Sequence, residues 1–304
     1  MKINLKSLLD AKSRSLVMES VIEKSFFFIG LSCLVVLFLI MLFLFVEGIP
    51  ILQKVSIGDF IFGTSWYPTG ANAKFGTLPL VVASLLVTLV ASIIAIPVSL
   101  AIAIYLSELA APAVREIVKP VIEIIASIPS VIIGFFGMVV VAPFLQNKFG
   151  IDTGQNLFNA AVMLAFMAIP TIASISEDAI SSVPRTLKEG SYALGANRWQ
   201  TIFHIVIPAS LSGIWTAIIL GISRVIGETM VVLMVAGNAA VIPKSLFAPV
   251  RPLTSTIAAE MAEAPVGGDH YNALFAIGII LFIITFFFNV VADYLTNKYK
   301  LKEN

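Results

Sequence analysis

Long apolar stretches alternate with shorter polar segments along the whole chain. A helix of about 20 apolar residues crosses a hydrocarbon core of roughly 30 Å. Backbone groups inside a bilayer must be hydrogen-bonded within the segment itself, which favours helices over irregular structure. We therefore predict an all-α integral membrane protein with six transmembrane helices, at residues 25–46, 78–106, 118–144, 157–176, 209–237 and 272–295.

Two of these spans carry internal features. Span 78–106 has a stripe of small side chains at helical spacing, which lets a second helix approach closely. The stripe consists of Ser84, Thr88, Ser92, Ala95, Ser99 and Ala103. Span 118–144 contains Ser127-Ile128-Pro129-Ser130, and a proline at that position predicts a kink.

The composition agrees with a membrane protein. Hydrophobic residues make up 59% of the chain and charged residues only 12%, and the mean hydropathy is +1.00. A soluble domain carries about 25% charged residues. The net charge of +1 and the absence of a basic tract give no reason to expect a nucleic-acid partner. The single cysteine, Cys33, excludes an internal disulfide, and the two histidines have no metal-site spacing.

The distribution of basic residues predicts the orientation. With the N-terminus inside, thirteen of the nineteen Lys and Arg residues fall in cytoplasmic segments and five in outer ones, and Arg224 lies within a span. This excess places both termini in the cytoplasm. We divide the chain into a cytoplasmic amphipathic segment (1–24), a first helix with its outer loop (25–77), a main transmembrane domain (78–296) and a cytoplasmic tail (297–304).

The polar segment at residues 183–208, called the central loop below, has fixed internal spacing. Glu189-Gly190-Ser191 is followed by Gly195 and then by Ile205-Val206-Ile207-Pro208. Lys188 to Asn197 reads as a short amphipathic helix leading into a tight turn at Gly195, where glycine accepts a positive φ. On the predicted orientation this segment is cytoplasmic.

The spacing of the central loop resembles the EAA loop of type I ABC transporter permeases. Gly190 and Ser191 replace the two alanines of that pattern, and Ile207 replaces its leucine. The resemblance implies a type I ABC permease architecture and a cytoplasmic surface that docks an ATPase subunit. The implied docking residues are Glu189, Gly190, Ser191, Ala193, Leu194, Gly195 and Ala196.

Two opposite charges lie within the predicted fifth span. Arg224 falls roughly 22 Å along a helix that starts at Ala209, and Glu228 follows four residues later on the same face of a continuous helix. Each charge costs about 3 kcal/mol on insertion scales, so both must face protein or water. One interpretation is a structural ion pair. The other is an anion path in which Arg224 attracts the anion and Glu228 holds the arginine between transport events.

The residues around this pair narrow the resemblance. Arg224-Val225-Ile226-Gly227-Glu228-Thr229-Met230, followed by Gly237-Asn238, is similar to oxyanion ABC permeases, and in particular to the PstC-type subunits of phosphate importers. The resemblance implies a substrate path that includes Arg224, Glu228, Ser223, Thr229 and Asn238. It also implies three kinds of partner: a PstA-like second permease, a dimer of ATP-hydrolysing subunits, and an extracytoplasmic phosphate-binding protein.

The chain itself contains no Walker-type phosphate loop, so ATP and Mg²⁺ are expected on the partner and no cofactor on this chain. We keep three alternatives to a phosphate permease: a permease for sulfate or molybdate, a gradient-driven secondary transporter or channel, and an intramembrane enzyme. In the outer loop 238–271, we predict a short helix that follows Leu253-Thr254 and runs through Ala264, with Thr254 or Ser255 as its cap. That helix either contacts the binding protein or only seals the bundle.

Overall fold

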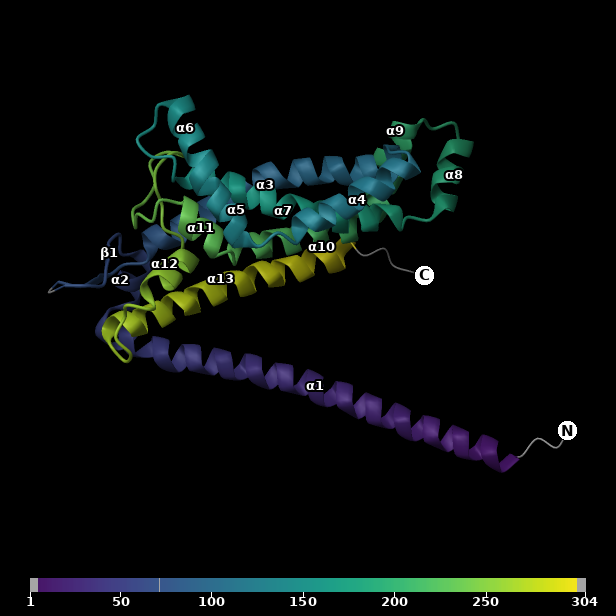
Figure 1. The fold of residues 1–304 in the computed structure, drawn as a ribbon, viewed down its shortest axis with the longest axis horizontal. Coiled ribbons are helices and arrows are strands. Elements are labelled where there is room, and N and C mark those ends of the chain that lie inside the picture. Colours follow the sequence, from purple (N-terminus) through teal and green to yellow (C-terminus); the bar gives the residue numbers. More distant parts are fainter. Residues whose placement is uncertain (1–4, 71, 300–304) are drawn as a thin grey trace.

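A computed structural model describes residues 5–70 and 72–299 (Figure 1). Within these residues six helices are long and apolar enough to cross a membrane, which confirms the predicted all-α membrane fold. Their bounds are Val21–Lys54, Leu78–Leu109, Ser130–Phe149, Leu157–Ser181, Arg198–Ile226 and Asp269–Tyr294.

The elements follow one another in a simple order. They are α1 (Leu5–Lys54), α2 (Ile57–Phe62), β1 (Trp66–Tyr67), β2 (Lys74–Phe75), α3 (Leu78–Ile104), α4 (Pro112–Ala126), α5 (Ser130–Phe136), α6 (Ala142–Phe149), α7 (Leu157–Ser181), α8 (Arg185–Ala193), α9 (Arg198–Thr201), α10 (Ile207–Ile226), α11 (Met230–Val235), α12 (Leu253–Glu260) and α13 (Asp269–Tyr299). Short π-helical turns occur at η1 (Tyr105–Leu109), η2 (Gly137–Val141) and η3 (Ile202–Val206). The antiparallel pair β1–β2 is the only sheet in the described part of the chain.

Helix α7 lies at the centre of the bundle, packed between α3 and α10. The small side chains predicted to allow close approach do so. Thr88, Ala95, Ser99 and Ala103 are buried, while Ser84 and Ser92 are half-buried. The Ser99 hydroxyl also donates to the carbonyl of Ile169 on α7 at 3.2 Å. Van der Waals contact between small residues is what holds helices together inside a bilayer.

The third crossing differs from the predicted continuous span 118–144. Helix α4 ends at Ala126, and the chain then restarts as α5 at Ser130. Pro129 removes a backbone donor and restricts Ile128 to an extended conformation, so the chain breaks here rather than bends. The crossing itself runs from Ser130 to Phe149, and α4 is a separate helix packed beside α7.

The fifth crossing is also broken. It runs from Arg198 through α10 to Ile226, and α11 begins only at Met230. Gly227 is a weak helix former, and the intervening Glu228 and Thr229 are not helical. The expectation that Glu228 follows Arg224 on one continuous helix is therefore wrong.

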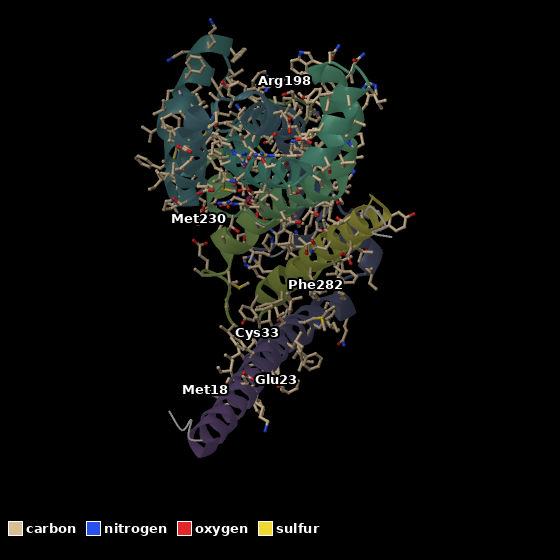
Figure 2. The ribbon with its side chains drawn as sticks, turned by 90° about the vertical axis from the view of Figure 1, so that its right-hand side faces the viewer. Met18, Glu23, Cys33, Arg198, Met230 and Phe282 are labelled. Atoms are coloured by element: carbon tan, nitrogen blue, oxygen red, sulfur yellow. The ribbon has the colours of Figure 1, made fainter. Side chains whose placement is uncertain are left out.

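Helix α1 contacts the rest of the protein through its C-terminal part. Phe43 meets Phe275 of α13 edge to face at 5.4 Å, and Gly48 leaves room for the α13 backbone at Ala276. Toward its start α1 diverges from the bundle, and Figure 2 shows Met18, Glu23 and Cys33 on this projecting part. Lipid is the expected surrounding for such apolar surface.

The structure does not test the boundaries predicted for the two terminal segments. Helix α1 runs without interruption through residue 25, so no structural boundary separates 1–24 from the first span. Residues 1–4 of that segment and 300–304 of the predicted tail lie outside the described residues. The start of α1 and the end of α13 both lie toward the end of the molecule that carries α8 and α9 (Figure 1).

Candidate functional site

Arg224 lies in the last turn of α10 and reaches across the bundle to two other helices. Its guanidinium donates to the Thr171 hydroxyl of α7 at 2.9 Å and to the Ala126 carbonyl, the last residue of α4, at 3.3 Å. Thr171 lies in the middle part of α7, so the guanidinium is held at mid-depth of the bundle. Both of these partners are uncharged, and the arginine is half-buried rather than sealed. Because neither partner carries a negative charge, the positive charge of the guanidinium is not neutralised and can attract another ligand.

Glu228 has different partners from Arg224. Its carboxylate Oε1 accepts the backbone N–H groups of Met230 and Val231, at 3.1 and 3.3 Å, and its backbone carbonyl accepts the Thr254 hydroxyl at 2.8 Å. A carboxylate on the free N–H groups of a helix start is favourable for both. Glu228 therefore caps α11 and ties the break in the fifth crossing to α12.

The other predicted path residues are spread around this break. The Ser223 hydroxyl donates to Asn289 of α13 at 3.4 Å, away from the partners of Arg224. The Thr229 hydroxyl donates to the carbonyl of Gly227 at 3.4 Å. Asn238 adopts a positive φ of 52° after α11, and its side-chain amide donates to the Leu233 carbonyl at 2.8 Å. Of these residues, Ser223 and Thr229 directly flank the Arg224–Glu228 segment in the chain, whereas Asn238 lies beyond the end of α11.

The central loop forms two short helices joined at Gly195. Gly195 has a φ of +84°, and open space surrounds the position that a Cβ would take. The Ser191 and Thr201 hydroxyls are 2.9 Å apart and join α8 to α9. Asn197 and Gln200 form a reciprocal capping box at the start of α9. The predicted helix and turn are thus confirmed.

The central loop carries several apolar side chains that are exposed. Leu194 is 92% exposed, and Trp199 stacks on Phe203 with ring centroids 6.0 Å apart while both stay exposed. Leu187 and Tyr192 are also exposed, and so is Glu189. Exposed apolar side chains on an otherwise polar segment are typical of a protein interaction surface.

On the opposite end of the bundle, four segments meet at Glu260. Its carboxylate accepts the Trp66 indole N–H at 3.1 Å and pairs with Arg251 at 2.5 Å and His270 at 2.8 Å. Trp66 is buried, packed edge to face on Phe75. This network joins the β1–β2 hairpin, the start of α13 and the end of α12, and so fixes these segments to one another.

Helix α12 starts and ends earlier in the chain than the sequence predicted. It runs from Leu253 to Glu260, and its N-terminal flanking residue is Pro252. Thr254 and Ser255 do not cap it: the Ser255 hydroxyl donates to the Pro252 carbonyl, and both residues are buried. The exposed part of this region follows the helix, where Val266 is 86% exposed.

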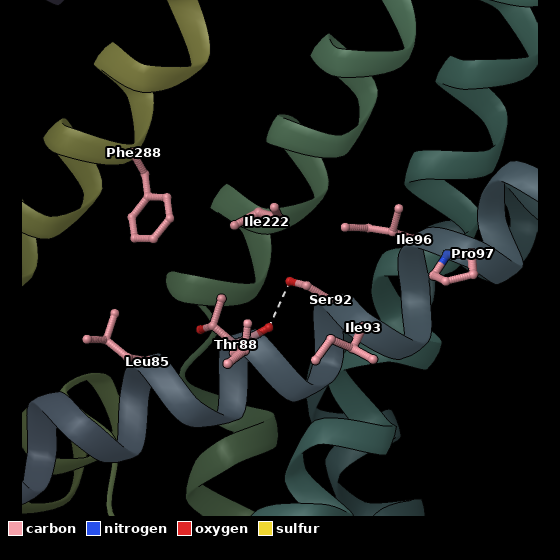
Figure 3. A pocket seen from close by; sticks show the side chains of 9 residues that line it. Leu85, Thr88, Ser92, Ile93, Ile96, Pro97, Ile222 and Phe288 are labelled. Atoms are coloured by element: carbon pink, nitrogen blue, oxygen red, sulfur yellow. Dashed lines mark hydrogen bonds between the residues drawn. The ribbon is translucent and has the colours of Figure 1, made fainter. Parts of the chain in front are cut away.

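An apolar groove of about 660 Å³ runs between α3, α10 and α13 (Figure 3). Ile93 and Pro97 of α3, Ile222 of α10 and Phe288 of α13 contribute to its walls. The Ser92 hydroxyl in this groove is already bonded to the Thr88 carbonyl at 2.7 Å. With no charged side chain in its lining, the groove suits a lipid chain or an apolar helix and not an anion.

Comparison with known proteins identifies the family of this helical membrane protein. Residues 95–301 match the family described as binding-protein-dependent transport system inner membrane component. The chain belongs to this family. It is a permease subunit of an ABC transporter, a multi-pass protein of the cell membrane and not an enzyme. The family also excludes the gradient-driven transporter as an interpretation.

Relatives in the family support the PstC-type resemblance. The chain is 38% identical to the probable ABC transporter permease protein YqgH of Bacillus subtilis, over 86% of this chain and 85% of the relative. It is 33% identical to the phosphate transport system permease protein PstC of Mesorhizobium japonicum, over 78% of this chain and 77% of the relative.

Solved ABC transporters share the fold. A bacterial alginate ABC transporter, solved in complex with its pentasaccharide-bound periplasmic protein, aligns over 95% of this chain and 96% of its own, with a TM-score of 0.63 and 15% identity. The methionine transporter MetNI in an inward-facing conformation aligns over 72% of this chain and 94% of its own, with a TM-score of 0.57 and 21% identity.

Three residues of the site were not predicted from the sequence. Thr171 and Ala126 contact Arg224, and Glu108 binds the central loop through Lys188 at 2.5 Å. Thr171 is one hydroxyl among many in the spans, and Ala126 acts through its backbone, so neither carries a sequence signal. Glu108 could have been noticed as an acidic residue at the end of a long span.

Proposed function

We propose that this chain is one of two permease subunits of an ATP-driven importer of inorganic phosphate. It forms half of the translocation path and docks an ATPase through the central loop. The second permease is PstA-like, an extracytoplasmic phosphate-binding protein delivers the anion, and ATP with Mg²⁺ binds to a dimer of ATP-hydrolysing subunits. Both termini and the central loop are cytoplasmic.

The observation that carries the proposal is the environment of Arg224. Its two hydrogen-bond partners, Thr171 and the Ala126 carbonyl, are neutral, and Glu228 is engaged with the start of α11. A structural ion pair would need Glu228 at the guanidinium. A positive charge with neutral partners at mid-depth instead suits a transient anion, because the planar fork of donors matches tetrahedral oxyanions.

We propose phosphate as the substrate, and not sulfate or molybdate, because phosphate transport system permease proteins PstC of several bacteria match this chain. The exposed apolar side chains of the central loop, such as Leu194 and Trp199, support the docking role. A permease without its own phosphate loop needs such a contact to receive energy from ATP.

The test is transport by the reconstituted complex. Proteoliposomes that contain this chain, the second permease, the ATPase and the binding protein should take up radioactive phosphate only when ATP is enclosed with the ATPase. Excess sulfate or molybdate should not compete. Uptake of sulfate or molybdate in preference to phosphate would show that this oxyanion is the substrate. Uptake without ATP would contradict the proposal of an ATP-driven importer.

A further inference from the structure

Glu108 holds the central loop to the end of η1. Its carboxylate pairs with Lys188 of α8 at 2.5 Å, and both side chains are largely buried, with exposures of 8% and 19%. Its backbone carbonyl accepts the guanidinium of Arg198 from α9. The two helices of the loop are further joined by Ser191 and Thr201. Any displacement of the loop therefore acts on Glu108 through two basic residues from different helices.

Helix α4 begins three residues beyond η1 and ends at the site. Its first residue is Pro112, and the carbonyl of its last residue, Ala126, accepts a hydrogen bond from Arg224 at 3.3 Å. Helix α4 is continuous over its 15 residues, with Pro120 in its interior, so a shift at its start is passed along the helix to Ala126. The chain thus connects Glu108 with a partner of Arg224 through one helix.

Polar contacts rather than apolar burial hold α4 in place. Helix α4 has no buried residue, although the neighbouring spans are well packed. It is fixed to α7 by Arg115 and Lys119, which pair with the buried carboxylate of Glu177 at 2.5 and 2.7 Å. Burial alone lowers the pKa of Lys119, but its hydrogen bonds to Asp178 and Glu177 outweigh this, so the pKa is raised and the side chain stays charged. Because α4 buries no side chain, a small shift that keeps these ion pairs opens no cavity.

We infer that Glu108 is a positioning residue for transport: it converts displacement of the ATPase-docked central loop into movement of α4, which withdraws the Ala126 carbonyl from Arg224. This inference rests on the proposed function. In this structure the carbonyl and Thr171 occupy donors of the guanidinium. Withdrawal of the carbonyl frees donors for the anion at the moment when the ATPase acts on the loop. Phosphate binding is thereby linked in time to ATP hydrolysis.

The first test compares Glu108→Gln with Glu116→Gln in the full reconstituted complex. Glu116 is an exposed acidic residue of α4 and serves as the matched control. Glu108→Gln should leave membrane abundance, ATPase copurification and ATP hydrolysis within about twofold of wild type. Phosphate imported per ATP should fall roughly tenfold, the effect of losing one charge-assisted hydrogen bond. Glu116→Gln should keep the wild-type ratio.

The charge-swapped pair Glu108→Lys with Lys188→Glu should recover most of the lost phosphate per ATP, because the carboxylate and ammonium can still meet. A swap as defective as Glu108→Gln would overturn the inference. If wild-type complex fails to import phosphate at all, the proposed function fails. If wild type imports and Glu108→Gln imports at the same ratio per ATP, the inference alone fails.

A second measurement reports on α4 directly. Ser127, exposed beside Ala126, is replaced by cysteine in a Cys33→Ser chain, which has no other cysteine. The rate of maleimide labelling should change when ATP binds to the complex that contains Glu108, and should not change in Glu108→Gln. An equal ATP-dependent change in both complexes would overturn the inference even if uptake differed.

Discussion

Arg224 and Glu228 are four residues apart and bind different parts of the protein. Arg224 donates to Thr171 and to the Ala126 carbonyl, whereas Glu228 accepts the N–H groups of Met230 and Val231. Helix α10 ends at Ile226, between the two residues. The positive charge of Arg224 therefore lies within the bundle, whereas the carboxylate of Glu228 caps α11 at the break.

The Arg224→Gln variant should abolish phosphate uptake while membrane abundance stays near that of wild type. Glutamine can still donate to Thr171, but it offers the anion no charge. The measurement is uptake per amount of complex, with Lys148→Gln, an exposed lysine of α6, as the control. The swap of Arg224→Glu with Glu228→Arg should not restore uptake, since the two side chains have different partners. Full uptake in the swap would contradict an anion station at Arg224.

Glu228→Ala should destabilise the break in the fifth crossing by about 1 kcal/mol, the usual cost of a lost helix cap. Glu228→Gln keeps an oxygen acceptor for Met230 and Val231 and should cost less. Both variants remove the negative charge four residues from Arg224 in the chain, so phosphate should bind more tightly and leave more slowly. Thermal unfolding checks the first effect, and equilibrium phosphate binding with release kinetics checks the second. Equal stability of the alanine and glutamine variants would argue against the capping role.

Gly195→Val should uncouple ATP hydrolysis from transport. A φ of +84° costs a residue with a Cβ about 1–2 kcal/mol, and a β-branched side chain suffers most. Gly195→Asn is the matched control, because asparagine accepts this conformation better. The space around the position is open, so backbone strain rather than a clash decides the result. The measurement is phosphate imported per ATP hydrolysed.

A charge reversal on α8 tests whether the central loop docks the ATPase. Glu189→Lys reverses the charge of an exposed residue of α8 and should weaken copurification of the ATPase. Lys188 beside it pairs with Glu108 and should remain in place, which keeps the loop folded. Copurification and uptake at wild-type levels in both Glu189→Lys and Gly195→Val would contradict ATPase docking through the central loop.

On the outer face, single cysteines should cross-link to the binding protein at exposed positions only. Val266→Cys and Glu263→Cys lie after α12 and are exposed, so they should capture the phosphate-binding protein. Ser255→Cys is the control, since Ser255 is fully buried. Silence at both exposed positions would favour α12 as a helix that only seals the bundle.

Some features of this protein follow from the sequence because they depend on local order alone. Hydropathy sets the number of spans, since the cost of unpaired backbone in lipid allows few other structures. The turn at Gly195 follows from glycine's tolerance of positive φ, and the close approach of α3 and α7 follows from the small residues of α3, such as Ala95 and Ser99. The family resemblance likewise depends on spacing that any structure must preserve.

Other features were decided only by the tertiary structure. The spacing of Arg224 and Glu228 indicates an ion pair only if the helix between them continues, and the break after Ile226 depends on capping contacts from Glu228 and Thr254. Ser255 is an ordinary N-cap candidate in the sequence, but packing buries it. The partners of Arg224 come from residues 53 and 98 positions away along the chain, and Glu108 meets Lys188 across 80. Contacts at such separations arise from the packing of helices, which local sequence patterns do not encode.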